Sequence, residues 1–403
     1  MKKPVRKFFE SIIERILMVS GWVTSLTILL IIIFLFKEGA GLFNRNSVEE
    51  EFVLAINSSN PVRNLTSYEI KEIFDHEITN WQTVGGINED IIVFRLNDIM
   101  DYIENDEQLG EDFEHVPFIL DSIIAAHAGM IAFFPKAYIA DNFSGAMIDD
   151  SKIKLSEFFG GNEWYPTTQP ASLFGVLPLV LGTLWVSLAA ILFALPFGLA
   201  VAIYLAELAG EKTRKILKPV IELLAGIPSV VYGFFGLVVF VPLIQKLFNL
   251  PVGETALVGA IVLAIMALPT IITVAEDSIR TVPHSVKEAS LALGANHWQT
   301  IWRVMIPYSI SGIMAAVVLG IGRAIGETMA VLMVTGNSAV IPHTLLTPVR
   351  TIPATIAAEL GEAPTGGVHY QALFLLGCVL FVITLIISIT AEMISMKQIK
   401  HSV

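Results

Sequence analysis

Six long stretches of mostly apolar residues divide this chain, and polar segments separate them. Each has roughly the 17 to 25 residues that a helix needs to cross the hydrocarbon core of a bilayer. In the second stretch, Pro178 and Pro196 indicate an interfacial lead-in or a kink. The pattern predicts an all-α polytopic membrane protein with six transmembrane helices. These are expected at 16–36, 173–204, 220–243, 256–274, 309–334 and 372–394.

The first stretch is expected to stay in the protein as a transmembrane helix. It is longer than the apolar core of a signal peptide. Lys37-Glu38-Gly39 follow it, where a signal peptide has a cleavage site made of small residues.

The polar connection between the first two stretches is long enough to form a small domain. Residues 52–56, 91–94 and 129–134 have the composition of strands, and residues 67–74 have that of a helix. Alternating strands and helices predict an α/β unit inserted between the first and second spans. The expected domains are a helix at 1–40, an α/β domain at 41–170 and a transmembrane domain at 171–403.

Lysine and arginine are concentrated in both ends of the chain and in the connections that follow the second and fourth stretches. Because the cytoplasmic side of a membrane protein carries the excess of lysine and arginine, both termini are expected to be cytoplasmic. The α/β domain then lies outside the cytoplasm. The expected location is the cell inner membrane, which the chain crosses several times in contact with lipid.

Composition supports this class and limits the chemistry. The chain is 54% hydrophobic and 15% charged, with a mean hydropathy of +0.69, whereas soluble domains are about one-quarter charged. A net charge of −12 argues against a nucleic-acid partner. Gly210-Glu211-Lys212-Thr213 lacks the spacing of a phosphate-binding loop, so the chain is not expected to hydrolyse ATP. We predict no enzymatic activity, no metal site and no cofactor.

The fifth stretch contains an arginine and a glutamate, Arg323 and Glu327. A charge at the centre of a bilayer costs roughly 2.5 to 3.5 kcal/mol, so such residues usually face a bundle interior or a water-filled path. On a continuous helix, residues four apart lie on one face, where Glu327 neutralises Arg323 until an anion competes. The pair is either a structural ion pair or an anion-handling site, and its place within the membrane favours the second interpretation.

The connection between the fourth and fifth stretches contains Glu288-Ala289-Ser290-Leu291-Ala292-Leu293-Gly294-Ala295, followed by Ile306-Pro307. This segment resembles the coupling loop of binding-protein-dependent ABC permeases. A short helix is expected from Glu288 to Leu293, with Glu288 stabilising its start and Gly294 ending it in a left-handed cap. The resemblance implies that the cytoplasmic loop 277–307 binds an ATPase, and that Glu288, Ala289 and Gly294 couple to it.

Three further segments, 224–236, 267–272 and 322–328, resemble the C-type permease subunit of phosphate ABC transporters. The resemblance covers about residues 173–398. It implies one half of the membrane channel of an ATP-driven phosphate importer. The expected partners are a second permease subunit in a heterodimer, a cytoplasmic ATPase dimer and an extracytoplasmic phosphate-binding protein. The expected substrate pathway for inorganic phosphate includes Arg323, Glu327, Thr328 and Ser229. Gly226, Gly233 and Gly236 are expected to allow close helix packing.

The inserted domain resembles one lobe of the phosphate-binding proteins, in residues 64–74, 78–86 and 129–134. In that family, a Ser-Gly-Thr at a helix start holds phosphate after the arginine of the preceding strand. Here Arg95 is followed by Leu96-Asn97-Asp98, and Asp98 and Asp101 would repel an anion. We therefore expect a docking or gating domain; the alternative is an insertion that only adds stability.

Three other functions remain open at this point. An importer for another oxyanion, such as sulfate or molybdate, would use the same arginine. A membrane sensor would use the outer domain to bind a ligand. A secondary transporter driven by an ion gradient would show discontinuous helices and repeats. The coupling loop argues against the last two.

Overall fold

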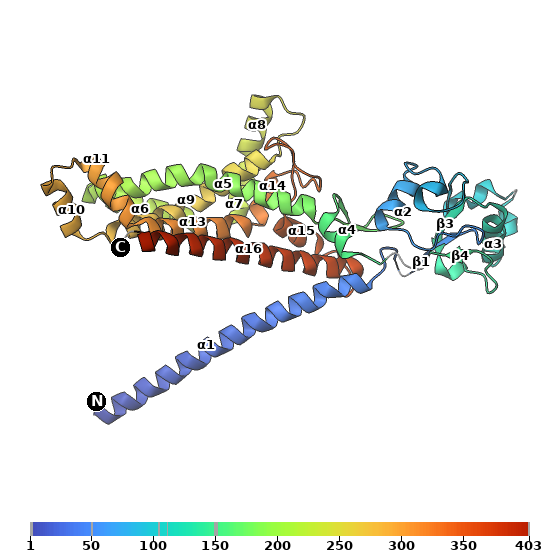
Figure 1. Cartoon of the computed structure of the whole chain (residues 1–403), viewed down its shortest axis with the longest axis horizontal. Helices are drawn as coiled ribbons and strands as arrows, with labels where there is room; N and C mark the ends of the chain where they lie inside the picture. Colours follow the sequence, from blue (N-terminus) through green and yellow to red (C-terminus); the bar gives the residue numbers. More distant parts are fainter. Residues whose placement is uncertain (1–2, 50, 104, 111, 149–151, 402–403) are drawn as a thin grey trace.

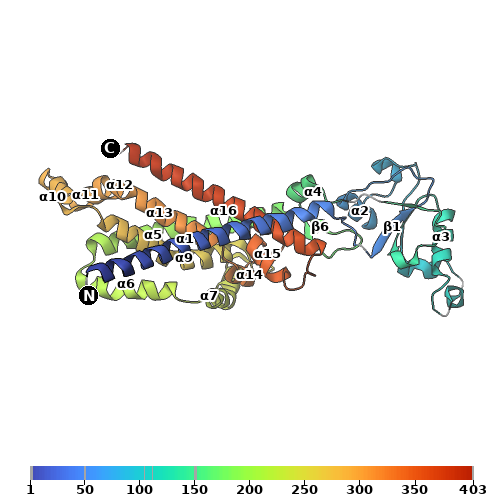
Figure 2. The same ribbon diagram turned by 90° about the horizontal axis from the view of Figure 1, so that it is seen from below.

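The computed structural model describes residues 3–49, 51–103, 105–110, 112–148 and 152–401. A helical bundle and an α/β lobe lie at opposite ends of an elongated molecule (Figure 1). Both ends of the chain lie toward the end of the bundle away from the lobe, as do α10 (His284–Ala292) and α11 (His297–Thr300). The view in Figure 2 shows the same separation.

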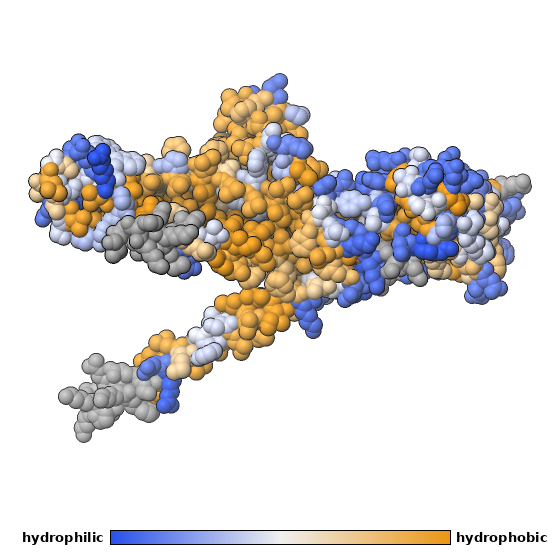
Figure 3. Space-filling view, viewed as in Figure 1, coloured by the Kyte–Doolittle hydropathy of each residue, from blue (hydrophilic) through white to orange (hydrophobic). Residues whose placement is uncertain are grey.

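Five helical segments are long and apolar enough to cross a membrane. A sixth is added if His297–Tyr308 and Ile310–Ile325, which meet at a bend of 69°, count as one span. The count is therefore five or six, and the predicted six spans stay a prediction. Apolar residues cover the bundle, whereas hydrophilic residues are gathered over the lobe (Figure 3). The five helical segments that are long and apolar enough to cross a membrane are Ile12–Asn44, Leu177–Leu208, Ser229–Phe248, Ala256–Arg280 and Val368–Met393.

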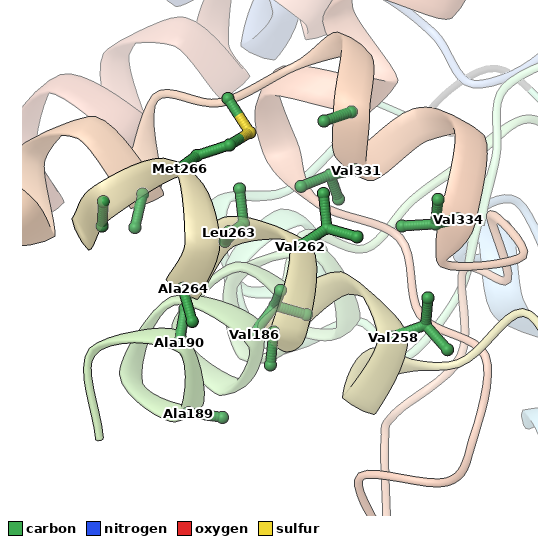
Figure 4. Close-up of a cluster of buried hydrophobic side chains, with 14 of the residues drawn as sticks. Val186, Ala189, Ala190, Val258, Val262, Leu263, Ala264, Met266, Val331 and Val334 are labelled. Carbon is green, nitrogen blue, oxygen red and sulfur yellow. The ribbon is translucent and has the colours of Figure 1, made fainter. Parts of the chain in front are cut away.

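The centre of the bundle is the contact between α5 (Leu177–Ile203) and α9 (Ala256–Arg280). Figure 4 shows Ala190 of α5 beside Ala264 of α9, and Val331 of α14 (Met329–Val334) beside Val262 of α9, with Val186 of α5 in the same cluster. Small residues and valines let the helix backbones approach closely. The remaining core helix, α13 (Ile310–Ile325), packs against both α5 and α9.

The predicted third span begins too early. Residues 220–225 belong to α6 (Glu211–Ala225), and a new helix, α7, starts at Ser229 and runs to Phe235. Pro228 explains the break, because it has no backbone N–H to donate and disfavours helical geometry at the residue before it. A π-helical segment, Gly236–Phe240, joins α7 to α8 (Val241–Phe248), which projects from the bundle in Figure 1.

The first and last long helices meet at the end of the bundle that faces the lobe. The C-terminal part of α1 (Lys3–Ala40) packs on α16 (Val368–His401), with the rings of Phe34 and Phe374 edge to face at 5.6 Å. A Cβ on Gly39 would lie 2.9 Å from Leu375 Cα, so the two backbones are close there. Toward its N-terminus, α1 diverges from α16 (Figure 1).

The lobe is built on a four-stranded sheet in the order β2-β3-β1-β4. Its strands are β1 (Phe52–Ile56), β2 (Ile92–Arg95), β3 (Met130–Pro135) and β4 (Ala146–Met147). Only β2 and β3 are parallel. The predicted strand at 52–56 is confirmed at its bounds, and those at 91–94 and 129–134 are confirmed with a shift of one residue.

Two helices cover opposite faces of this sheet. On one face, Ile70 and Ile73 of α2 (Ser67–Phe74) pack with Ile56 of β1. On the other face, Leu120 of α3 (Val116–Ala126) packs with Ala55, the residue before Ile56 in β1. Successive residues of a strand point to opposite faces, so β1 contributes to both cores. The predicted α/β unit and the helix at 67–74 are confirmed.

A further core, separate from that of the bundle and from the two cores of the lobe, joins the lobe to the bundle. It combines buried residues from α4 (Leu155–Gly160), β6 (Leu173–Phe174) and α15 (Ile352–Glu359) with Leu376 of α16. The strand β5 (Trp164–Tyr165) pairs with β6 and contributes the fully buried Trp164. Because the same core contains residues of α16 and of the segments that follow the lobe, the two parts of the molecule are packed together.

Candidate functional site

The expected site residues of the fifth span lie at a break between two helices. Helix α13 ends at Ile325, and α14 begins at Met329. Gly326 caps the end of α13 and lowers the helix propensity there by about 1 kcal/mol relative to alanine. Glu327 then accepts a hydrogen bond from the backbone N–H of Ala330 at 3.3 Å, which caps the start of α14.

The predicted pairing of Arg323 with Glu327 on one helical face is therefore wrong. The spacing of four residues places two side chains together only on a continuous helix, and this helix is interrupted between them. In the part of the chain that the structure describes, no ion pair joins Arg323 to Glu327. Thr328 lies between the two helices, and its hydroxyl donates to the carbonyl of Gly326 at 3.3 Å.

The second break, at Gly226–Pro228, leads to the same region. Tyr232 of α7 donates its hydroxyl to the carbonyl of Leu224 at 2.8 Å, which holds the end of α6 beside α7. Helix α7 also contacts α14, the helix that follows the break in the fifth span. Ser229 is the first residue of α7 and lies about one turn before Tyr232. Ser229 therefore lies at the break that precedes α7. Arg323, Glu327 and Thr328 lie at the break between α13 and α14.

Glycines allow α7 and the π-helical segment after it to lie close to α14 and α9. A Cβ on Gly233 would lie 2.9 Å from Ala330 Cα, and one on Gly236 would lie 2.7 Å from a methyl of Val262. The expectation of close packing is therefore confirmed for Gly233 and Gly236. It is wrong for Gly226, which is exposed and ends α6.

Irregular backbone at membrane depth is tolerated where protein buries it or where it lines a cavity. A cavity of about 560 Å³ lies beside the break in the fifth span. Gly326 and Thr328 line it on one side, and Pro353, Ile356 and Leu360 line it on the other. The cavity lies beside the break itself, and Arg323 is not among its lining residues.

The coupling segment forms a helix that starts earlier than predicted. Helix α10 begins at His284, directly after Pro283, so Glu288 lies in its middle. The predicted role of Glu288 at the start of the helix is wrong for this reason. The predicted cap is confirmed, because Gly294 has φ +87° and its N–H donates to the carbonyl of Leu291 at 2.9 Å.

The surface of this segment is partly apolar. Glu288 and Ala289 are exposed, and Leu293 is 90% exposed. Leu291 and Trp298 are exposed as well. Exposed large apolar side chains that gather on one segment indicate a protein contact.

Two buried carboxylates that the sequence analysis missed hold this end of the bundle together. Glu276 of α9 is 1% exposed and lies 3.0 Å from Arg214 and 3.2 Å from Lys218, both on α6. Glu207, in the π-helical segment Tyr204–Leu208 that follows α5, forms an ion pair with Lys287 of α10. Arg214 and Lys218, four residues apart on a polar helix face, were the only sequence signal for this cluster.

In the lobe, the structure agrees with the expected loss of an anion site. The backbone N–H of Arg95, which precedes the position of the Ser-Gly-Thr in the phosphate-binding proteins, donates to Asp98 at 2.7 Å. The Arg95 guanidinium lies 5.5 Å from the centre of the Phe74 ring. A carboxylate of the chain itself therefore occupies the start of the following 3₁₀ turn, Leu96–Asp101.

Two family models match this chain. Residues 194–399 match the binding-protein-dependent transport system inner membrane component, and residues 35–182 match the PBP superfamily domain. The second match covers the lobe and its junction with the bundle.

Curated relatives align with the larger part of the chain. The probable ABC transporter permease protein YqgH of Bacillus subtilis is 40% identical over 242 residues, which cover 60% of this chain and 78% of the relative. The phosphate transport system permease protein PstC of Mesorhizobium japonicum is 40% identical over 259 residues, with the same coverage of 60% and 78%. PstC 1 of Mycobacterium tuberculosis is 36% identical over 270 residues, covering 58% of this chain and 80% of the relative.

The first family match extends over the coupling helix, the helices on both sides of Gly226–Pro228 and of Gly326–Thr328, and most of α16, which are the parts that carry the candidate site. The family match and the relatives set aside the sensor and the secondary transporter. The chain belongs to the family of binding-protein-dependent transport system inner membrane components, as a permease subunit rather than an enzyme.

Proposed function

We propose that this chain is a permease subunit of an ATP-driven phosphate importer and that it forms one half of the path through the membrane. The observation that carries the proposal is the position of Arg323, whose side chain lies at the end of α13 beside a break in a membrane span. Among the described residues, no carboxylate forms an ion pair with it. Relatives named as phosphate transport permeases support the choice of phosphate.

The chemistry of the site fits an anion. A guanidinium has planar, fixed donors that match the oxygens of phosphate, and it keeps its charge at any physiological pH. At about 4 Å and an effective dielectric constant of about 20, one charge pair contributes roughly 4 kcal/mol before desolvation. That is enough to favour occupancy by an anion and still allow its release.

Glu327 has a different role from the one that its spacing suggested. Because its carboxylate caps α14, it fixes the geometry of the break and leaves the Arg323 charge available to a solute. Ser229 presents its hydroxyl group at one break as a donor to phosphate oxygens. Thr328 at the other break exchanges its hydrogen bond to the Gly326 carbonyl for one to phosphate. The four residues together form the proposed pathway.

The proposed assembly places the lobe outside the cytoplasm and both termini inside, following the distribution of lysine and arginine. A second permease subunit completes the path as a heterodimer, and an extracytoplasmic binding protein delivers phosphate. Two ATPase subunits bind the coupling segments through Glu288, Ala289 and the exposed Leu293. Gly294 ends the coupling helix so that these side chains are presented at one end of the molecule.

The test is phosphate uptake by the assembled complex in proteoliposomes. Arg323→Ala is expected to reduce uptake at least about tenfold, since the variant loses most of an interaction of about 4 kcal/mol. Lys246→Ala, which removes an exposed cation from α8, serves as the matched control and is expected to keep the parental rate. An assembled Arg323→Ala complex with parental uptake would refute the proposal. Inhibition of uptake by excess sulfate or molybdate would point instead to a broader oxyanion importer.

A further inference from the structure

One carboxylate at the junction between the lobe and the bundle collects contacts from three separate elements. Glu359, the last residue of α15, lies 2.7 Å from the Arg350 guanidinium, which precedes α15. Its other oxygen accepts a hydrogen bond from Trp164 Nε1 of β5 at 3.0 Å and lies 2.8 Å from His369 Nε2 of α16. The Glu359 side chain is 12% exposed, so water screens these contacts little.

Trp164 connects this carboxylate to the lobe. It is fully buried and packs edge to face on Phe174, with 5.5 Å between the ring centroids. Helix α2 of the lobe contacts the same segment, because Lys71 lies 3.5 Å from Glu163, the residue before Trp164. A displacement of α2 therefore acts directly on the strand that holds Trp164.

At its other side, α15 is connected to the broken fifth span. The N–H of Ile352 at the start of α15 donates to the hydroxyl of Thr183 on α5 at 2.9 Å. The carbonyl of Arg350 occupies the space where a Cβ on Gly182 would lie. Helix α15 forms one wall of the cavity of about 560 Å³ whose other wall contains Gly326 and Thr328.

The surroundings of Glu359 offer other hydrogen-bond partners. Trp164, Asn337, Arg350 and Glu359 line a polar cavity of about 420 Å³. Among the described residues, two buried polar atoms of its lining residues, Arg350 Nε and Asn337 Oδ1, have no hydrogen-bond partner. Asn337 also donates to the carbonyl of Leu332 in α14 at 2.8 Å. Buried polar atoms without partners call for an explanation, and a second bonding arrangement of the junction supplies one.

We propose that Glu359 is a latch between the outer lobe and α15, through which the position of the lobe sets the width of the cavity beside the broken fifth span. Glu359 is a positioning residue, since it acts on the pathway through α15. The lobe is then a gating domain, docked on the permease by hydrogen bonds that break and reform. The effect on transport rests on the proposed phosphate import, whereas the latch itself does not.

The experiment uses the complete assembled transporter and three variants. Glu359→Gln removes the charge, and Trp164→Phe removes the indole N–H but keeps an aromatic ring in the core. Glu362→Gln is the matched control, because Glu362 lines the same cavity and forms no ion pair among the described residues. Each variant is first checked for assembly by purification with its partner subunits.

Hydrogen exchange of the backbone amides of α15 tests the latch without reference to the transported solute. Loss of one buried hydrogen bond corresponds to about a two- to tenfold change in local opening, so both latch variants are expected to exchange faster by that factor. The control is expected to exchange at the parental rate. Parental exchange in both latch variants would overturn the proposal.

The ratio of phosphate imported to ATP hydrolysed tests the gate. Glu359→Gln and Trp164→Phe are expected to hydrolyse ATP with less phosphate imported per ATP than the control. Faster exchange of α15 with a parental ratio would overturn gating by the latch. A parental complex that imports no phosphate would refute the proposed function instead, and the exchange of α15 would still decide whether the latch exists.

Discussion

Gly294 shows how one residue shapes the coupling segment. It has φ +87°, and a Cβ placed on it would contact nothing within 4 Å. The need for glycine there comes from the backbone alone, because a side chain in the left-handed region costs roughly 1–2 kcal/mol. Leu291 and Leu293, on either side of the end of α10, take their direction from this cap.

Gly294→Ala is therefore expected to fray the end of α10 and to weaken binding of the ATPase subunits by about tenfold, in line with that backbone cost. Affinity measured by titration of the purified ATPase into the permease complex checks this. Gly210→Ala is the control, since Gly210 also has open space around it but does not have a positive φ. Equal affinities for the two variants would contradict the role given to the cap.

Residue spacing predicted some of these positions and missed others for physical reasons. Gly294 was predictable because the conformation of a helix end depends on the residues next to it. The partner of Glu327 was not, because its carboxylate has two nearby alternatives: a cation four residues back and a free N–H three residues ahead. Spacing alone does not show that the carboxylate accepts from the N–H of Ala330, instead of pairing with the cation, once Gly326 has ended the helix.

Among the elements, α7 and α14 meet through backbone rather than side chains. A Cβ added to Gly233 would lie only 2.9 Å from Ala330 Cα. Gly233→Ala is expected to displace α7 and destabilise the complex by about 1–3 kcal/mol, the usual cost of overpacking. The measurement is the thermal midpoint of the complex, together with its phosphate uptake.

Gly226→Ala is the matched control for this element. The same added methyl group would meet only the carbonyl of Leu223, at 3.4 Å. We expect a midpoint close to the parental one. If both alanine variants lowered the midpoint by the same amount, the contact of α7 with α14 would not be the cause, since only Gly233 makes that contact.

The elements themselves were predictable where local pattern decides them. The strand at 52–56 alternates between two cores, and the helix at 67–74 begins at a capping box formed by Thr66 and Glu69. The two breaks were not recognised, because long apolar runs flank Gly226–Pro228 and Gly326–Thr328 and make each stretch look like one span. Apolar content determines whether a segment enters the membrane, whereas glycine and proline determine whether it stays one helix.

At the scale of the whole molecule, contacts between distant parts of the chain were beyond the sequence analysis. Glu276 meets Arg214 across 62 positions, and Glu359 meets Trp164 across 195. Local spacing marks Arg214 and Lys218 as a charged helix face, but it identifies the partner in neither pair, because each partner depends on how the elements pack. These long-range carboxylates attach α6 to α9 at one end of the bundle and the lobe to α15 at the other.

The junction at Glu359 also predicts a dependence on pH. Burial by itself raises the pKa of Glu359, but hydrogen bonds from His369 and Trp164 and the charge of Arg350 outweigh it and hold the pKa below 4.5. A carboxylate whose pKa is lowered in the folded state stabilises that state above its ordinary pKa. The stabilisation is lost as the pH falls through the lowered value.

The thermal midpoint of the parental complex minus that of Glu359→Gln isolates this contribution. The other charged groups around the carboxylate, Arg350, His369 and Glu362, are present in both proteins. The difference is expected to stay constant from neutral pH down to about pH 5 and to shrink below it, because there the carboxylate of the unfolded state begins to take up a proton while that of the folded state is still ionised. A difference that already changes between about pH 7 and pH 6 would assign the titration to His369, and the junction would then respond to the histidine rather than to the carboxylate.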